Sequence, residues 1–198
     1  MGLKIFKKYL FRLKVFFVKI TNVNLEVGDG SRIDFGTKII SCGNRIYLGK
    51  KVYLRSNPKF YQAGMPFSTT LLTDVKGSFI NVGDNCRING VYIHAQAGIT
   101  IGRNCVIASG VHIIDSNGHE LISIDRTKGR DIPLEIIIGD NVWIGINAVI
   151  LKGTIIGENS VIAAGSIVKG SFPKNSLIMG NPAQLVKSLD IKDENSAS

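Results

Sequence analysis

His119 is the side chain best suited to proton transfer, and it stands in a polar stretch beside Asp115, Asn117 and Glu120. A neutral imidazole has an unperturbed pKa near ~6.5, so it can accept a proton from a hydroxyl group at physiological pH. Such a base must itself be oriented, and Glu120, Asp115 or a backbone carbonyl could accept the other ring N–H. The alternative is an ordinary solvent-exposed histidine in a loop.

Two further histidines, His94 and His112, are weaker candidates for contact with a substrate. His94 falls six residues after Ile88, where the repeat described below favours an aliphatic side chain, so we expect it to be partly buried or to line a cleft. His112 directly precedes the aliphatic Ile113 and is expected to face outward.

The three cysteines, Cys42, Cys86 and Cys105, are too few for a disulfide framework and form no CxxC pair of the kind that binds zinc. Cys86 and Cys105 recur at the same place in the repeat, where small side chains gather. We predict that both belong to the core and that neither is a nucleophile or a metal ligand. No serine stands in a nucleophile-elbow motif either, so a covalent enzyme intermediate is not indicated.

A repeat of six residues must position these side chains. Aliphatic residues six positions apart form one long ladder and several short ones: Ile138, Ile144, Ile150, Ile156, Ile162 and Val168; Ile101, Ile107 and Ile113; Val82 and Ile88; Val27, Ile33 and Ile39; Leu48 and Leu54. Glycine often follows the aliphatic residue, and a small residue often comes four positions after it. Neither a helix nor an isolated strand has this period.

A triangular prism explains the period. Each hexapeptide forms one flat wall and one corner, and its aliphatic side chain points inward and stacks on its counterpart three hexapeptides later. The corners need left-handed backbone angles, which glycine and asparagine tolerate. The sequence therefore predicts an all-β solenoid of parallel strands over residues 23–187.

Two long segments interrupt the repeat, at residues 55–79 and 114–137. The second separates Ile113 from Ile138 by far more than the one hexapeptide that the ladder requires. A long loop inside a compact domain is commonly functional. We predict that residues 114–137 protrude from the prism and carry His119.

The two ends of the chain differ from the repeat. Residues 1–22 predict a basic amphipathic helix, with an apolar stripe that either lies on an anionic membrane through residues 1–20 or packs against the protein. Because charges interrupt every apolar run, this segment fits neither a signal peptide nor a spanning helix. The polar residues 188–198 predict a disordered tail.

The net charge of +9 is concentrated in the N-terminal segment, so the main body is only mildly basic. This distribution argues against a nucleic-acid-binding groove.

Four stretches resemble the hexapeptide-repeat acetyltransferases: Asp115–His119, IGDNVWIG at 138–145, AAGSIV at 163–168 and GNPAQLVK at 180–187. The resemblance covers roughly residues 25–187 and is closest to the sugar and polysaccharide O-acetyltransferases, related to the maltose, galactoside and xenobiotic enzymes. It implies a left-handed parallel β-helix, a homotrimer with sites between subunits, acetyl-CoA as acyl donor and no metal. It also implies that His119 is the general base for direct transfer in a ternary complex. The sugar or glycan acceptor would then meet Asn89, His94, Asp115 and Asn117.

The same resemblance places acetyl-CoA along the C-terminal coils. Trp143 would line the thioester end, and small residues would leave room for the pantetheine arm: Gly145, Ala163 and Ala164. Lys169 and Lys187 would neutralise the phosphates. Alternatively, Trp143 makes a trimer contact and both lysines are ordinary surface charges.

Three other functions remain to be weighed. One is N-acetylation of a nucleotide-linked amino sugar, although such relatives usually carry an added domain. Another is a non-catalytic β-helix scaffold. The third, the γ-class carbonic anhydrase, holds zinc with three histidines whose spacing His94, His112 and His119 do not match. We expect a cytoplasmic protein, either free or peripheral on the inner face of the membrane.

Overall fold

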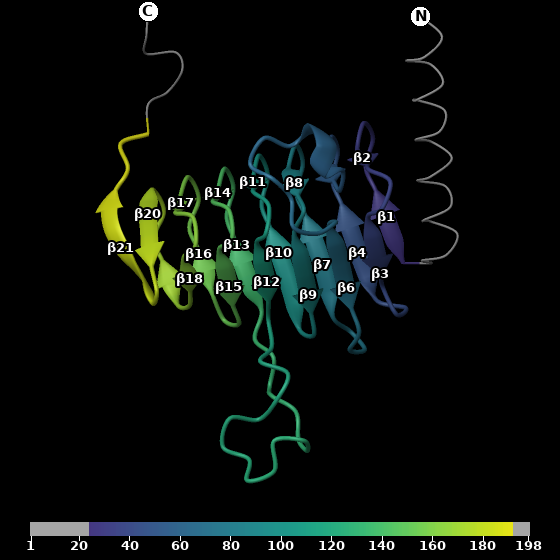
Figure 1. Cartoon of the computed structure of the whole chain (residues 1–198), viewed down its shortest axis with the longest axis vertical. Coiled ribbons are helices and arrows are strands. Elements are labelled where there is room, and N and C mark those ends of the chain that lie inside the picture. The colour runs from purple at the N-terminus through teal and green to yellow at the C-terminus, as the bar shows by residue number, and fades with distance from the viewer. Residues whose placement is uncertain (1–23, 192–198) are drawn as a thin grey trace, which may run out of the picture.

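A computed structural model describes residues 24–191 (Figure 1). The predicted helix at 1–22 and residues 192–198 of the predicted tail lie outside the described residues. Within 24–191, no helical segment has the length and apolarity that crossing a bilayer requires.

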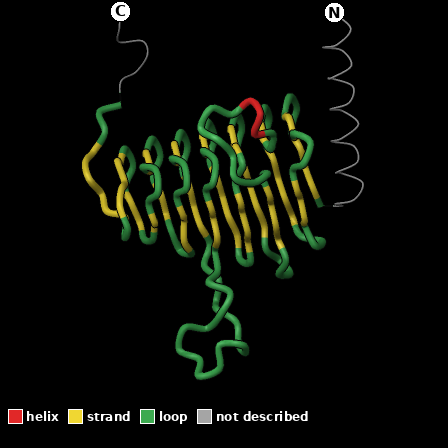
Figure 2. The backbone as a smooth tube through the Cα atoms, viewed as in Figure 1, coloured by secondary structure: helices red, strands yellow, loops and turns green. Residues whose placement is uncertain are grey.

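Short strands stack into three sheets, and the chain visits sheets A, B and C in turn (Figures 1 and 2). Sheet A contains β1 (Leu25–Val27), β4 (Arg45–Leu48), β7 (Phe79–Val82), β10 (Gly98–Ile101), β13 (Ile136–Ile138), β16 (Ile155–Ile156) and β19 (Ser171–Phe172). Sheet B contains β2 (Arg32–Ile33), β5 (Tyr53–Arg55), β8 (Arg87–Asn89), β11 (Val106–Ile107), β14 (Trp143–Ile144), β17 (Val161–Ile162), β20 (Ser176–Gly180) and β21 (Ala183–Ser188). Sheet C contains β3 (Lys38–Ile40), β6 (Thr70–Thr73), β9 (Tyr92–Ala95), β12 (His112–Ile114), β15 (Val149–Leu151) and β18 (Ile167–Val168).

Neighbouring strands pair in parallel throughout, except that β20 and β21 are antiparallel. The regular register joins each residue to one eighteen positions on, as in Ile138 with Ile156. The predicted all-β solenoid of parallel strands is therefore confirmed. The early interruption holds one short 3-10 helix, η1 (Pro58–Phe60).

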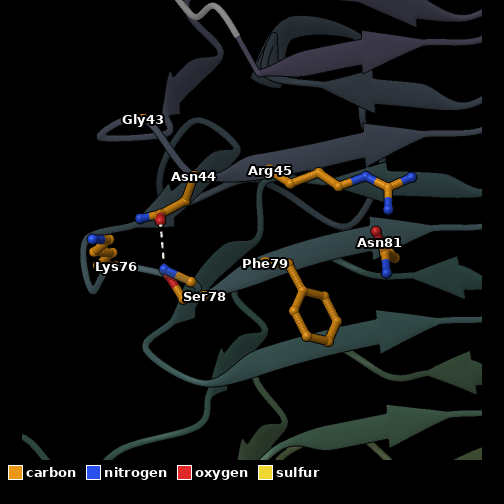
Figure 3. Close-up of a pocket in the computed structure, with 8 residues that line it drawn as sticks. Gly43, Asn44, Arg45, Lys76, Ser78, Phe79 and Asn81 are labelled. Atoms are coloured by element: carbon orange, nitrogen blue, oxygen red, sulfur yellow. Dashed lines mark hydrogen bonds between the residues drawn. The ribbon is translucent and has the colours of Figure 1, made fainter.

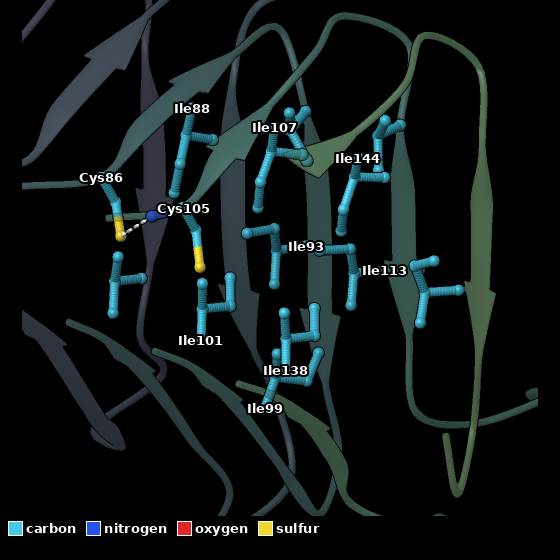
Figure 4. Close-up of a cluster of buried hydrophobic side chains, with 14 of the residues drawn as sticks. Cys86, Ile88, Ile93, Ile99, Ile101, Cys105, Ile107, Ile113, Ile138 and Ile144 are labelled. Atoms are coloured by element: carbon cyan, nitrogen blue, oxygen red, sulfur yellow. Dashed lines mark hydrogen bonds between the residues drawn. The ribbon is translucent and has the colours of Figure 1, made fainter. Parts of the chain in front are cut away.

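The aliphatic ladders form the core (Figure 4). Ile88, Ile107 and Ile144 stack on adjacent strands of sheet B and have no exposed surface. The core is looser at its two ends, where Val27 and Ile39 in the first coil and Phe172 near the last are only partly buried. The prediction that the aliphatic positions point inward is thus confirmed.

The corners have the predicted backbone. Asparagine adopts positive φ angles of 55–59° at six corners: Asn85, Asn104, Asn141, Asn147, Asn159 and Asn175. The left-handed region is the one that asparagine tolerates better than other side chains.

Cys86 and Cys105 lie in the core, as predicted, with no exposed surface. The backbone N–H of Cys105 donates to the Cys86 sulfur at 3.4 Å. Hydrogen bonding with Cys105, together with burial, raises the pKa of the Cys86 thiol far above its ordinary range. The thiolate, which is the nucleophilic form, is therefore disfavoured at this position.

Stacked glycines set how closely the coils approach. A Cβ atom on Gly139 would lie 2.7 Å from the backbone nitrogen of Glu158 in the next coil. We predict that Gly139→Ala lowers the free energy of unfolding by about 2 kcal/mol, because the coils must separate to admit a methyl group. Urea denaturation measures the change. The control Ser171→Ala, at an exposed position of the same sheet, should change it by less than about 0.5 kcal/mol, and equal effects would contradict the prediction.

Candidate active site

The protruding loop leaves the prism between β12 and β13 and spans residues 115–135 (Figures 1 and 2). It replaces the turn that every other coil makes on passing from sheet C to sheet A. We call this edge of the prism the C-to-A corner. Its preceding turns follow β3, β6 and β9.

Asp115 anchors the first residue of the loop. Its Oδ1 accepts the N–H of Gln96 at 2.7 Å, and its Oδ2 accepts those of Ala97 and Gly98 at 2.8 Å each. The side chain has no exposed surface, and this burial raises the pKa of the Asp115 carboxyl, while the three N–H donors oppose the rise. A substrate cannot touch a carboxylate enclosed in this way, so the contact predicted for Asp115 does not occur in this arrangement. Its partners make Asp115 a positioning residue.

A second anchor, the Asp131–Lys152 clamp, closes the base of the loop. Lys152 Nζ lies 2.5 and 2.6 Å from the two Asp131 carboxylate oxygens and donates to the Ile132 carbonyl at 3.0 Å. Asp131 Oδ2 also accepts the N–H of Asn117 at 2.8 Å, which ties the outgoing and returning strands of the loop together. The side chains of Lys152 and Asp131 are only 13% and 9% exposed. The Asn117 N–H and then Lys152 hold the pKa of the Asp131 carboxyl below its ordinary value.

His119 follows two residues after Asn117, whose N–H the clamp holds, and its side chain is exposed. In the described part of the chain its ring has no hydrogen-bond or ion-pair partner. The expectation that Asp115 or Glu120 orients the ring is therefore not met within one protomer: Asp115 is bonded to another turn, and Glu120 contributes only its carbonyl, to Arg126. The imidazole is presented outward from an anchored loop base.

His94 belongs to the neighbouring turn. The inward position is taken by Ile93, five residues after Ile88, so the expected register at 94 was wrong and His94 faces the outside of sheet C. The prediction that His94 is partly buried is confirmed. Its Nε2 lies 3.0 Å from Asp74 Oδ1, to which Gln96 Nε2 also donates at 3.3 Å. His94 and Gln96 thus connect the turn after β6 with the turn that binds Asp115.

The other side chains considered for contact with the acceptor lie in different environments. Asn117 is exposed near the loop base, whereas Asn89 is only 6% exposed and donates to the Ile107 carbonyl at 2.8 Å. His112 faces outward as predicted, with Nδ1 3.2 Å from the Gly110 carbonyl oxygen. The geometry therefore groups His94 and Asn117 at the C-to-A corner, while Asn89 belongs to the packed interior.

The predicted CoA residues gather elsewhere, on sheet B and at the corner from sheet B to sheet C. Trp143, Val161, Leu177 and Lys187 occupy successive rungs of one row on the outer face of sheet B. Trp143 is 55% exposed and Lys187 is exposed. The four rungs span roughly 14 Å, so the row is long enough to lie along an extended pantetheine arm.

Small residues mark the adjoining corner. A Cβ on Gly145 would lie 2.6 Å from the backbone nitrogen of Ala164, and Ala163 and Ala164 form the next turn. Lys169 does not join this group, because it follows β18 at the C-to-A corner. The structure thus brings together Trp143 and Lys187 with the small residues, but not Lys169.

Sheet C separates the two groups within one protomer. The loop of His119 leaves the end of β12, whereas Gly145 and Ala164 precede the sheet C strands β15 and β18. The loop also exposes large apolar side chains, which isolated proteins rarely gather: Leu121, Ile122, Ile124, Ile132 and Leu134. Within one protomer, therefore, His119 and the predicted CoA residues lie on different sides of sheet C, and the loop that carries His119 has an uncovered apolar surface.

Sequence reasoning missed the clamp and the contacts of Asp74 and Gln96. Asp131 and Lys152 are both charged residues near the loop, but their pairing depends on how the turn after β15 meets the returning strand. No described group of three His, Cys, Asp or Glu side chains is placed to hold a metal ion.

Asp115 gives a testable consequence. In Asp115→Ala, three buried or half-buried N–H groups lose their acceptor, so we expect the free energy of unfolding to fall by about 3 kcal/mol. The control Asp125→Ala removes a partly exposed carboxylate that bonds Thr127 in the loop and should change the free energy of unfolding far less. Urea denaturation of both variants makes the comparison. A loss at Asp115 no larger than that at Asp125 would refute the anchoring role.

Two family models match the repeat. "Bacterial transferase hexapeptide (six repeats)" matches residues 135–170, and "Hexapeptide repeat of succinyl-transferase" matches residues 80–114. These ranges contain the long ladder and the ladder that precedes the loop.

Named relatives agree with these models. A "Putative acetyltransferase" of Dictyostelium discoideum is 35% identical over 147 residues, which are 74% of this chain and 70% of the relative. The "Putative lipopolysaccharide biosynthesis O-acetyl transferase WbbJ" of Escherichia coli (strain K12) is 39% identical over 113 residues, 52% of this chain and 58% of the relative. With that relative, as with several others, the match spans less than two thirds of the curated protein's length.

Among solved structures, the hexapeptide-repeat containing acetyltransferase of Vibrio cholerae O1 biovar eltor, complexed with acetyl coenzyme A, superposes with a TM-score of 0.57 at 28% identity. The superposition covers 84% of this chain and 72% of that one. Together with the three-sheet solenoid and its interrupted coil, these similarities show that the chain belongs to the hexapeptide-repeat acetyltransferase family.

Proposed function

We propose that the chain is an acetyl-CoA-dependent O-acetyltransferase whose acceptor is a hydroxyl of a sugar or a surface polysaccharide. The observation that carries this proposal is the doubly anchored loop that presents His119 outward at the C-to-A corner. The acetyl donor is supported by the Vibrio relative complexed with acetyl coenzyme A, and the glycan acceptor by the Escherichia relative named for lipopolysaccharide biosynthesis.

In this mechanism acetyl-CoA supplies the acyl thioester. His119 removes the proton of the acceptor hydroxyl as the hydroxyl oxygen attacks the acetyl carbonyl carbon, and the protonated ring then returns that proton to the leaving sulfur. The acetyl group passes directly to oxygen, so no acyl-enzyme forms. His94 and Asn117 would orient the acceptor on the side of the loop, and Asp115 would act only through the position of the loop.

Acetyl-CoA would be bound by residues of sheet B and of the corner from sheet B to sheet C. The indole face of Trp143 suits the thioester end, and the small side chains of Ala163 and the exposed Ala164 would leave room for an amide-containing arm. Gly145 is buried and would act by letting this turn lie close against the preceding coil. Lys187, three rungs from Trp143 along the row, would meet the phosphates of the donor. Lys169 lies at the C-to-A corner, so it would meet them from a neighbouring protomer.

The two halves of the site would meet in a homotrimer. Because sheet C separates the loop from the Trp143 row, one protomer would supply His119 and its neighbour the donor site. The exposed apolar residues of the loop would pack on that neighbour. We further propose that the coil is left-handed, that residues 1–20 contact the membrane peripherally, and that the protein works in the cytoplasm.

An acceptor screen tests the function. Purified protein is mixed with acetyl-CoA and a panel of neutral and charged mono- and oligosaccharides, amino sugars and a nucleotide-linked amino sugar, and free thiol release is followed. Acceptor-dependent release with formation of a sugar O-acetyl ester supports the proposal. Transfer to an amine alone would establish N-acetylation instead, and absence of transfer to any member would favour a scaffold.

A further inference from the structure

A hollow on the surface of the prism lies at the same C-to-A corner as the loop (Figure 3). Its volume is about 510 Å³, and the turns that precede β4 and β7 form its walls. Its lining includes two cations, two asparagines and one aromatic ring: Arg45, Lys76, Asn44, Asn81 and Phe79.

Unsatisfied polar atoms line this hollow. Asn44 is only 8% exposed, and its Oδ1 accepts the N–H of Gly77 at 2.9 Å (Figure 3). Its Nδ2, a donor, has no hydrogen-bond partner among the described residues, and neither does the acceptor Asn81 Oδ1. Buried amide groups are normally hydrogen-bonded, so these two side chains have unused hydrogen-bonding capacity. Both atoms are enclosed, so each amide must rotate toward the hollow before a ligand can bond it.

The charge of the hollow is positive. Lys76 is exposed and forms no ion pair with any described residue. Arg45 lies 3.5 Å from Glu26 and 5.7 Å from the centroid of the Tyr47 ring, so Glu26 offsets one of the two cations. The guanidinium still has several N–H donors to offer, and the Lys76 ammonium remains uncompensated.

A flat apolar surface lies between these groups. Phe79 extends over Gly98 of the next strand, where an added Cβ would lie only 2.4 Å from two atoms of the ring. The glycine therefore gives the ring its place against the sheet. In Figure 3, Lys76 and Asn44 lie toward one end of the ring, and the Arg45 guanidinium and Asn81 toward the other. An aromatic ring flanked by polar groups is suited to the apolar face and hydroxyl rim of a pyranose.

The hollow is continuous with the loop through hydrogen-bonded turns. Asp74, two residues before Lys76, meets His94 and Gln96 of the following turn. That turn is bound in its own right by the Asp115 carboxylate at the root of the loop. Since adjacent coils lie about 4.8 Å apart, the turn beside the hollow is roughly 10 Å from the root of the loop.

We propose that this hollow binds a negatively charged sugar residue of the acceptor, one that carries a carboxylate or a phosphate group. Lys76 and Arg45 neutralise the anionic group, and Phe79 receives the apolar face of the ring. The Asn44 and Asn81 amides rotate toward the hollow and bond the polar substituents of the ring. An adjoining residue of the same glycan then reaches His119. This inference rests on the proposed O-acetyltransferase function and narrows its substrate to acidic glycans.

Matched probes test the proposal by direct binding. Trisaccharides of galacturonic acid, glucuronic acid and sialic acid are compared with their methyl esters, and glucose 6-phosphate with glucose, by titration calorimetry of the full chain without acetyl-CoA. The variant Lys76→Met is compared with Lys50→Met, which removes another exposed lysine from a different corner. Both positions lie in surface turns, so both variants are expected to fold.

At least one anionic probe should bind about fivefold or more tightly than its neutral counterpart, with most of that preference lost in Lys76→Met and retained in Lys50→Met. Preference within the carboxylate series or the phosphate pair identifies the group. Absence of preference in every pair, or the same preference in Lys76→Met as in the wild type, would overturn the proposal.

Thiol release with the same probes keeps the two hypotheses apart. Equal acetylation of neutral and anionic sugars, unaffected by Lys76→Met, refutes the acidic-glycan site and leaves the transferase function standing. Charge-dependent binding without transfer to any hydroxyl removes the transferase function and leaves the sugar site.

Discussion

The substitution His119→Gln is expected to lower kcat for acetyl transfer by about 10²–10⁴-fold. Glutamine keeps the size and polarity of the side chain but cannot take the hydroxyl proton during attack. The affinity for CoA should stay within about twofold, because the proposed contacts with CoA come from sheet B and its adjoining corner and not from the His119 side chain. Thiol release gives kcat, and titration with CoA gives the dissociation constant.

His112→Gln is the matched control. His112 also faces outward and lies near the loop in sequence, but its Nδ1 is held by the Gly110 carbonyl and its ring packs against Phe67. We expect its kcat to stay within about threefold of the wild type. If His119→Gln keeps full turnover, or if both histidines prove equally important, His119 is not the base.

The second large effect is expected at the loop clamp, with Lys152→Met. This change leaves the Asp131 carboxylate largely enclosed with no cation beside it, and removal of one partner from a buried pair costs about 3 kcal/mol. Because Asp131 also holds the Asn117 N–H, that amide should exchange with solvent about 100-fold faster. The loop then no longer fixes His119, and kcat should fall by about tenfold or more.

A double substitution separates charge from geometry. Asp131→Asn combined with Lys152→Met removes both charges and should recover part of the lost stability, since the single variant suffers mainly from the unpaired carboxylate. Lys174→Met breaks an exposed pair with Glu158 at 4.0 Å and should change stability by less than about 0.5 kcal/mol. An Asn117 amide as well protected in Lys152→Met as in the wild type would contradict the clamp.

Acid should open the clamp in the intact protein. The folded state holds the pKa of Asp131 below its ordinary value of 3.8, so this carboxylate stabilises the fold above that pH. Its contribution is lost as the pH falls through the lowered value. Asp115 acts in the opposite direction, because its pKa is raised and its ionisation costs stability as the pH rises above 3.8. The protection factor of the Asn117 amide, which corrects for the intrinsic pH dependence of exchange, should therefore fall only in strong acid. A fall in this protection factor near neutral pH would point to another group.

The period of six predicted the fold because every coil of a solenoid solves the same packing problem. An inward aliphatic side chain, a small residue and a corner asparagine recur from coil to coil. The pattern therefore remains recognisable even where a single hexapeptide departs from it. The buried positions of Cys86 and Cys105 followed from that register alone. The register failed at His94, because the coil between Ile88 and Ile93 is one residue short and turns His94 outward.

The candidate site was less predictable from sequence, since its supports are not local. A carboxylate close to a loop histidine looks like a substrate contact, and Asp115 was predicted as one. Its partners are backbone N–H groups of the preceding turn, which carry no side-chain signature. The pairing of Asp131 with Lys152 likewise depends on the path of the returning strand, which a periodic pattern does not specify.

The most direct test of the account is complementation between two inactive variants. His119→Ala removes the base, and Ala164→Glu places a charged side chain at an exposed position of the proposed donor site. Each variant alone should be inactive while binding one of the two substrates. If neighbouring protomers share each site, a trimer assembled at random from equal amounts of both should regain about one quarter of wild-type activity. No activity in the mixed trimer would contradict the claim that His119 of one protomer serves the thioester held by the next.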